Sequence, residues 1–106
     1  MRALGFGALF AIVACGPKSE PREAHTYQVE IRGMQFVPAS LHVERGDLVV
    51  WKNSDLVPHT VTSPGFFDSG PLQPGAKWTW AVTQNGVQLD YVCTMHPTMK
   101  AALIVQ

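Results

Sequence analysis

Short runs of alternating apolar and polar residues, separated by prolines and glycines, constrain this chain more than any other feature of its sequence. Tyr27, Val29 and Ile31 alternate with polar residues, and Leu41 and Val43 repeat the pattern. A period of two is typical of strands that are buried on one face. Because no stretch shows helical periodicity of useful length, the sequence predicts an all-β protein.

Further runs extend this pattern toward the C-terminus. Residues 48–53 (LVVWKN) form a continuous apolar run, which is typical of a strand buried on both sides. Residues 77–82 alternate again, Asn85-Gly86 is a hairpin-type turn before the run 87–93, and residues 101–105 form the last run. About seven to eight short strands predict a small Greek-key β-sandwich or barrel.

The N-terminal segment reads as a signal and not as part of this fold. Met1-Arg2 supplies a positive start, and the apolar stretch from Leu4 to Ala14 is eleven residues long, whereas spanning a bilayer takes about 20. Ala14-Cys15 resembles the lipobox of bacterial lipoproteins, in which the cysteine becomes the lipid-carrying first residue. Residues 1–14 are therefore predicted to be a lipoprotein signal peptide. An ordinary secretory signal with an incidental cysteine, or a buried N-terminal strand, are the alternatives.

The segment that follows Cys15 is expected to be a flexible linker. Residues 16–24 (GPKSEPREA) contain two prolines and four charges but no large apolar side chain, so they cannot bury enough surface to fold. Nine extended residues reach at most about 30 Å. Residues 15–24 would thus tether a domain of residues 25–106 close to a membrane, in the periplasm or at the cell surface.

Charge and length exclude several classes of protein. The chain of 106 residues has eight basic and eight acidic side chains, and no basic residues cluster in a run, which argues against nucleic-acid binding. The length allows one domain at most, and we expect a monomer.

Cys93 and its neighbours carry the chemistry. If Cys15 holds a lipid, Cys93 is the one remaining thiol of an exported domain, which is unusual in an oxidising compartment; a Cys15–Cys93 disulfide is the competing interpretation. The spacing Cys93-x2-His96-x2-Met99, with His59 upstream, supplies a thiolate, two imidazoles and a thioether. This donor set is typical of a single electron-transfer copper centre. His25 and His42 lack such support and are expected to be solvated.

Five segments then resemble the cupredoxins, the blue copper proteins of the plastocyanin and amicyanin group. They are residues 36–38, 46–53, 58–61, 67–70 and 91–99, in the same order as in that family. The short ligand loop is more similar to that of amicyanin than to that of plastocyanin.

The resemblance implies a role for each residue of the site. It implies that His59, Cys93 and His96 are equatorial copper ligands and that Met99 is a weak axial ligand. It also implies that Asn53 and Thr60 do not bind copper but hold the ligands in place through hydrogen bonds. Thr60 occupies the place where many members have asparagine. The resemblance also implies an electron port at His96, flanked by Met95 and Pro97, in an apolar patch to which Pro71, Leu72 and Pro74 contribute.

The predicted function is that of a membrane-tethered type 1 copper protein, not an enzyme. It would shuttle single electrons between redox proteins of a respiratory or periplasmic chain. The alternative is a periplasmic protein that holds or delivers copper without redox cycling, but the methionine-rich or histidine-rich segments expected for delivery are absent from this sequence. A copper oxidase or nitrite reductase is disfavoured because the chain has no second set of histidine ligands for a catalytic copper.

Overall fold

Nine β-strands in two sheets make up the part of the protein that the computed structural model describes, residues 22–106. The predicted signal peptide and Cys15 lie outside these residues. The strands are β1 (Thr26–Arg32), β2 (Gln35–Val37), β3 (Ser40–Val43), β4 (Leu48–Asn53), β5 (Thr62–Ser63), β6 (Phe67–Asp68), β7 (Lys77–Ala81), β8 (Val87–Cys93) and β9 (His96–Val105). Within residues 22–106, no helix has the length and apolar character needed to cross a membrane.

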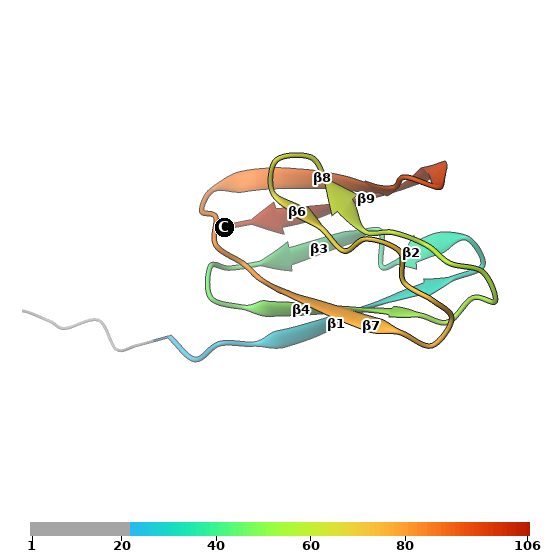
Figure 1. Cartoon of the computed structure of the whole chain (residues 1–106). Coiled ribbons are helices and arrows are strands. Elements are labelled where there is room, and N and C mark those ends of the chain that lie inside the picture. Colours follow the sequence, from blue (N-terminus) through green and yellow to red (C-terminus); the bar gives the residue numbers. More distant parts are fainter. Residues whose placement is uncertain (1–21) are drawn as a thin grey trace, which may run out of the picture.

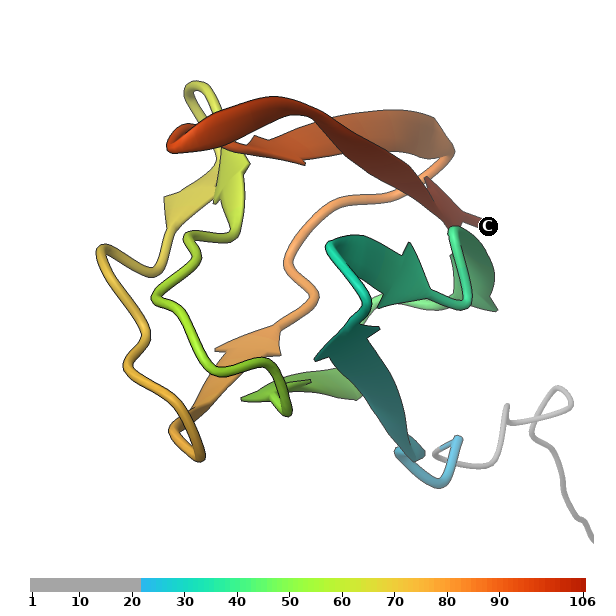
Figure 2. The ribbon, with the colours of Figure 1, turned by 90° about the vertical axis from the view of Figure 1, so that its right-hand side faces the viewer.

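The two sheets face each other around one core (Figures 1 and 2). One sheet has the strand order β2-β1-β4-β7 and the other the order β3-β9-β8-β5-β6. The pairs β1–β4 and β3–β9 are parallel, whereas the other pairs are antiparallel. This all-β architecture confirms the predicted fold class, and its strands outnumber the expected seven to eight because β2, β5 and β6 are only two or three residues long.

Two details of the predicted strands were wrong. β4 is not buried on both sides, because Leu48 and Val50 lie on the outer face of its sheet while Val49 and Trp51 are fully buried. Asn85-Gly86 does not form a hairpin, since β7 and β8 belong to different sheets. The segment instead crosses between the sheets. The N–H of Gly86 donates to the carbonyl of Gln106 at 3.0 Å, an ordinary hydrogen-bond length.

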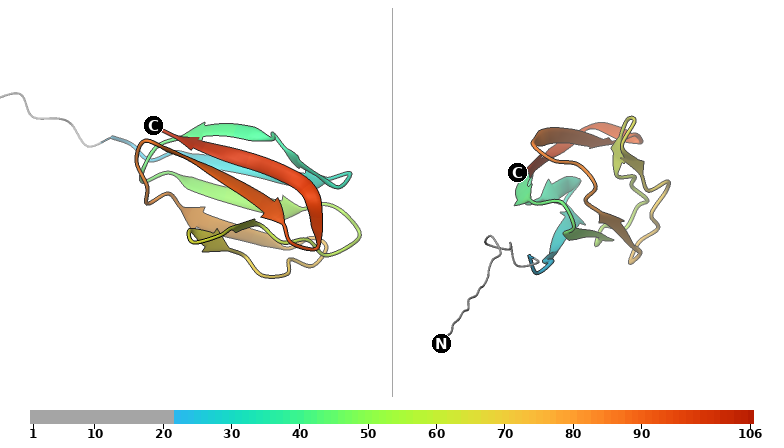
Figure 3. Two further views of the ribbon diagram at one scale, coloured as in Figure 1. Left: turned by 90° about the horizontal axis from the view of Figure 1, so that it is seen from above. Right: turned by 90° about the vertical axis from the view of Figure 1, so that its left-hand side faces the viewer.

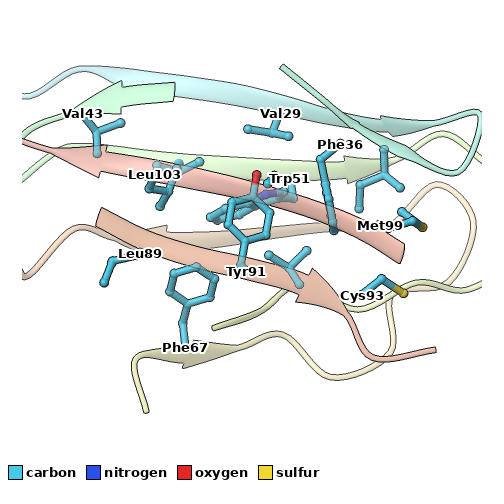
Figure 4. Close-up of a cluster of buried hydrophobic side chains, with 14 of the residues drawn as sticks. Val29, Phe36, Val43, Trp51, Phe67, Leu89, Tyr91, Cys93, Met99 and Leu103 are labelled. Atoms are coloured by element: carbon cyan, nitrogen blue, oxygen red, sulfur yellow. The ribbon is translucent and has the colours of Figure 1, made fainter. Parts of the chain in front are cut away.

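Large aromatic side chains fill the middle of the barrel (Figure 4). The Trp51 ring contacts Tyr91, Phe67 and Trp78, with centroid separations of 5.5, 5.6 and 5.5 Å, within the range of favourable aromatic pairs. Burial raises the pKa of Tyr91 to about 12, an effect that the nearby Trp51 side chain partly offsets. A buried aromatic cluster therefore lies in the core beneath the end of the barrel where β8 stops.

The β8–β9 hairpin carries the sequence motif to that end of the barrel (Figure 3). Its register pairs Val87 with Val105 at one end and Cys93 with His96 at the other, so the turn contains only Thr94 and Met95. β9 thus begins at His96 and is longer than the expected run 101–105. We call this end of the barrel the metal pole, defined by the β8–β9 turn and the loop that carries His59, and the opposite end the tether pole, defined by Arg22 and the β3–β4 turn.

Candidate metal centre

Cys93 and His96 are brought together by the tight β8–β9 turn. Cys93 ends β8 and is fully buried, while His96 begins β9 and is half-buried. A register shift between Val92 and Cys93 locally bends β8, as irregularities of this kind re-aim side chains near strand ends. The Cys93 Sγ atom lies 3.8 Å from the Nδ1 atom of His96.

His59 reaches the same place from a loop far upstream. Its side chain is fully buried, and its Nδ1 atom lies 3.7 Å from the Cys93 Sγ atom. Two backbone hydrogen bonds to Leu72 fix the loop: the His59 N–H donates to the Leu72 carbonyl at 3.1 Å, and the Leu72 N–H donates to the His59 carbonyl at 2.7 Å. The position of His59 therefore depends on backbone pairing as well as on side-chain packing.

The three donor atoms are spaced as ligands of one metal ion. The ligand atoms of His59, Cys93 and His96 all lie within 4.8 Å of one another, and they form the one such group found among residues 22–106. Bonds of about 2.3 Å to sulfur and about 2.0 Å to nitrogen, at trigonal angles, place sulfur and nitrogen about 3.7 Å apart. The two measured distances from Cys93 Sγ match this value, so the residues fit a trigonal His2Cys metal site.

Met99 adds a thioether at the same pole. On β9 the buried residues alternate, so Met99 lies on the inner face with Ala101, Leu103 and Val105. Figure 4 shows the sulfur atoms of Met99 and Cys93 directed toward the same end of the barrel. A thioether beside a His2Cys group completes the donor set that copper favours in electron-transfer sites.

Asp55 is a functional residue that the sequence analysis missed. Its carboxylate lies 2.8 Å from His59 Nε2 and accepts hydrogen bonds from the backbone N–H groups of Gly33 (2.7 Å) and Met34 (3.0 Å). Burial by itself would raise the pKa of Asp55, but the Met34 N–H, the His59 ring and the Gly33 N–H together hold it below its ordinary value. An ionised carboxylate can only accept, so His59 carries its proton on Nε2 and leaves Nδ1 free for a metal.

The sequence signal for Asp55 was weak. Only its position four residues before His59, in a loop with no regular spacing, could have pointed to it. The contact with Gly33 and Met34 depends on the β1–β2 turn, which lies more than twenty residues earlier in the chain. A single sequence does not show that such a turn packs against the ligand loop.

Thr60 links the two segments that carry the ligands. Its backbone N–H donates to Cys93 Sγ at 3.3 Å, and its hydroxyl oxygen accepts from the Thr94 N–H at 2.8 Å. The hydroxyls of Thr60 and Thr94 lie 3.0 Å apart. Thr60 therefore braces the β8–β9 turn and helps to fix the position of the Cys93 sulfur.

Asn53 braces the loop that carries His59. It is fully buried, and its side-chain amide donates to the carbonyls of Val57 and Leu72, each at 2.9 Å. Its side-chain oxygen accepts from the Asp55 N–H at 2.9 Å. Asn53 therefore connects the end of β4 to both segments that position His59.

Exposed apolar side chains surround the metal pole. Met95 is 45% exposed in the β8–β9 turn, and Leu56 in the neighbouring loop is 92% exposed. Val57 and Met34 are about as exposed as Met95. Pro71, Pro74 and Pro97 are exposed as well, but Leu72 is buried, so it does not contribute to the surface patch proposed from the sequence. His25 and His42 are exposed and lie outside the donor group.

Comparisons with known proteins agree with this site. The family model of the cupredoxin-like domain matches residues 5–105. The chain is 32% identical to amicyanin-alpha of Methylorubrum extorquens, in an alignment that covers 100% of both chains. It is also 32% identical to amicyanin of Paracoccus denitrificans, over 74% of this chain and 63% of that protein.

Solved structures show the same similarity. A Cu(I) form of an amicyanin variant superposes with a TM-score of 0.71 and 28% identity, covering 82% of this chain and 87% of that one. The oxidized state of another amicyanin variant gives a TM-score of 0.70 and 29% identity, covering 76% and 82% of the two chains. The similarity therefore extends over both the fold and the part of the chain that carries the candidate ligands.

Proposed function

The chain belongs to the family of cupredoxin-like domains, and from this membership we propose that it carries single electrons between redox proteins at the cell envelope while tethered to a membrane through Cys15. Its cofactor is one copper ion, for which His59, Cys93, His96 and Met99 are positioned as ligands. The observation that carries the proposal is the placement of the Cys93 sulfur 3.7 and 3.8 Å from two imidazole nitrogens.

When bound, copper supplies a one-electron couple between Cu(I) and Cu(II). The residues of the chain supply fixed positions for its ligands. His59 is held from two directions, by backbone pairing with Leu72 and by the Asp55 carboxylate, and Cys93 is held by the Thr60 N–H. Ligands held in this way move little when the charge of the site changes, which keeps the reorganisation cost of electron transfer low.

His96 is the proposed electron port. It is the half-buried imidazole of the pair, whereas His59 is fully buried. Its neighbours Met95 and Pro97 are exposed, so a partner protein that docks on the apolar surface of the metal pole would approach the His96 ring. Without residues 1–14, which include Arg2, the chain has seven basic and eight acidic side chains and a formal charge of −1. Long-range attraction therefore contributes little to such an encounter, which suits a small and transient interface.

A copper titration tests the redox function against copper delivery. Residues 22–106 would receive one equivalent of Cu(II), followed by visible and electron paramagnetic resonance spectra during reductive and oxidative titration. A strong thiolate-to-copper band with reversible one-electron cycling is the expected result. Binding of Cu(I) alone, or of Cu(II) without that band, would support the delivery function instead.

Met99→Leu is expected to keep the thiolate band and to raise the reduction potential. Loss of an axial donor weakens binding of Cu(II) more than binding of Cu(I), and each tenfold change in that ratio raises the potential by about 59 mV. We expect a rise of about 60 mV or more in cyclic voltammetry. Met95→Leu is the matched control, since Met95 lies in the adjacent turn and is exposed. Equal potentials for Met99→Leu and the unmodified protein would assign Met99 to packing alone.

Cys15→Ser is expected to release the full-length protein from membranes. The side chain that would receive the lipid is lost, and the remaining apolar stretch is too short to span a bilayer. Vesicle flotation and mass spectrometry of the N-terminal peptide would measure the effect. Membrane retention of the Cys15→Ser protein would show that another feature anchors it.

A further inference from the structure

Asp47 is the central residue of the tether pole. Its side chain is fully buried, and its carboxylate accepts the N–H groups of His25 at 3.0 Å and Glu44 at 2.9 Å. Its backbone carbonyl accepts the Val82 N–H at 2.8 Å. A buried carboxylate needs compensating donors and a positive charge, and Arg22 supplies the charge.

Arg22 joins the segment before β1 to this residue. Its guanidinium donates to Asp47 Oδ1 at 2.8 Å and lies 2.9 Å from a carboxylate oxygen of Glu44. It also lies 3.1 Å from His25 Nδ1. Arg22 is four residues before the start of β1, within the segment expected to be a linker. We call this set of contacts, from Arg22 to Asp47 and Glu44, the Arg22 latch.

The latch lies at the opposite end of the barrel from the copper ligands. In Figure 1 the described chain enters at the same end of the barrel as the C-terminus, and the β8–β9 turn lies at the far end of the molecule. β9 runs from His96 at the metal pole to Val105 near the tether pole. Ten residues of strand span about 30 Å, which sets the distance between the poles.

The latch also shortens the free length of the tether. Seven peptide units separate Cys15 from Arg22, and ten separate Cys15 from His25, whose backbone is held by Asp47 and Leu48 without Arg22. At 3.3 to 3.6 Å per residue, these lengths are at most about 25 Å and about 36 Å. A tether held at Arg22 is thus shorter than the barrel, whereas a tether that is first held at His25 is longer.

This difference decides which end of the protein can face the bilayer. For the metal pole to turn onto the membrane, the tether must span the distance between the poles. Four exposed apolar side chains would favour such an orientation: Met34, Leu56, Val57 and Met95. Their burial at the membrane interface would lower the free energy. In that orientation the bilayer would cover His96.

We propose that the Arg22 latch keeps the metal pole directed away from the bilayer, so that the apolar surface around His96 remains available to partner proteins. The inference rests on the proposed membrane tether at Cys15. It assigns a function to a partly buried ion pair that lies outside the copper site, and it makes Arg22 an orienting residue for electron transfer.

A fluorescent probe at the metal pole tests this proposal. The processed protein, lipidated at Cys15, would carry Leu56→Cys labelled with an environment-sensitive fluorophore and would be bound to phosphatidylcholine vesicles. Three forms would be compared: the unmodified latch, Arg22→Gln and Arg45→Gln. Arg45 is the matched control because it is exposed in the same β3–β4 turn and has no ion pair among residues 22–106.

Arg22→Gln is expected to shift the emission to shorter wavelength on vesicle binding and to increase quenching by nitroxide-labelled lipids at least twofold. The other two forms are expected to show neither change. Equal quenching in all three forms would overturn the latch, as would a blue shift with the latch intact. Failure of all three forms to float with vesicles would instead overturn the tether at Cys15, and with it the proposed orientation.

Discussion

Cys93→Ser is expected to abolish the intense visible band of the copper-loaded protein while the domain stays folded. The band requires charge transfer from a thiolate, and a serine hydroxyl at this position remains protonated and binds copper weakly. Because Cys93 Sγ is the atom that both imidazoles face, we also expect reversible redox cycling to be lost. Visible absorption and electron paramagnetic resonance spectra would measure both effects.

The control for this experiment must separate loss of a ligand from loss of structure. Trp51 is buried in the aromatic core, so its fluorescence reports whether the Cys93→Ser domain is folded. Thr98→Ser, an exposed substitution in the same motif, should leave the band intact. A persistent thiolate band in folded Cys93→Ser protein would exclude Cys93 as the ligand.

Asp47→Ala is expected to destabilise the domain by roughly 2–4 kcal/mol, because it leaves two backbone N–H groups without their acceptor and Arg22 without its main partner. A loss of this size would lower the melting temperature of a domain this small by about 10 °C or more. Urea unfolding of residues 22–106 at neutral pH would measure it. Asp90→Ala is the control, since Asp90 is exposed on β8 and its side chain bonds only Gln88 among the described residues. Equal losses for the two variants would contradict the assigned role of Asp47.

The Asp47→Ala substitution should also change how the free energy of unfolding depends on pH. Burial by itself would raise the pKa of Asp47, but the N–H groups of His25 and Glu44 and the Arg22 guanidinium together lower it. A lowered pKa contributes stability that is fully present above the ordinary carboxyl pKa and is lost as the pH falls through the lowered value. Asp47→Ala should therefore lose less stability between neutral pH and pH 3 than the unmodified protein does.

The sequence predicted the fold class because its strands show strong alternation. Val29 and Ile31 are fully buried, as their spacing indicated, and Trp78 and Trp80 face the core from β7. The pairing between distant strands could not be predicted from the sequence. Periodicity shows which face of a strand is buried, but it does not show which strand lies beside it. The run 48–53 was misassigned for the same reason: an apolar residue on the outer face of a sheet looks like a buried one.

The copper ligands could be predicted because Cys93, His96 and Met99 supply soft donors at a spacing that is typical of an electron-transfer copper site. His59 was assigned only jointly with that motif, which lacks a second imidazole, since a lone histidine after a proline has many possible roles. Asp55 and the carbonyl and N–H groups of Leu72 escaped prediction because their roles depend on tertiary contacts between loops. Residues that bind a metal are recognisable by their chemistry, whereas residues that orient them are recognisable only by position.

The place of β9 in its sheet also has a consequence for biogenesis. β9 lies between β3 and β8, and it carries two of the four copper ligands at its start. Because β9 joins β3 to β8, the sheet is incomplete and the metal site cannot assemble until β9 has paired with both strands. Pairing of β3 with β9 joins residues about sixty positions apart, which is typical of slow folding. Before that pairing, Cys93 lacks His96 and Met99 as neighbours, so the complete donor set forms only when β9 has folded.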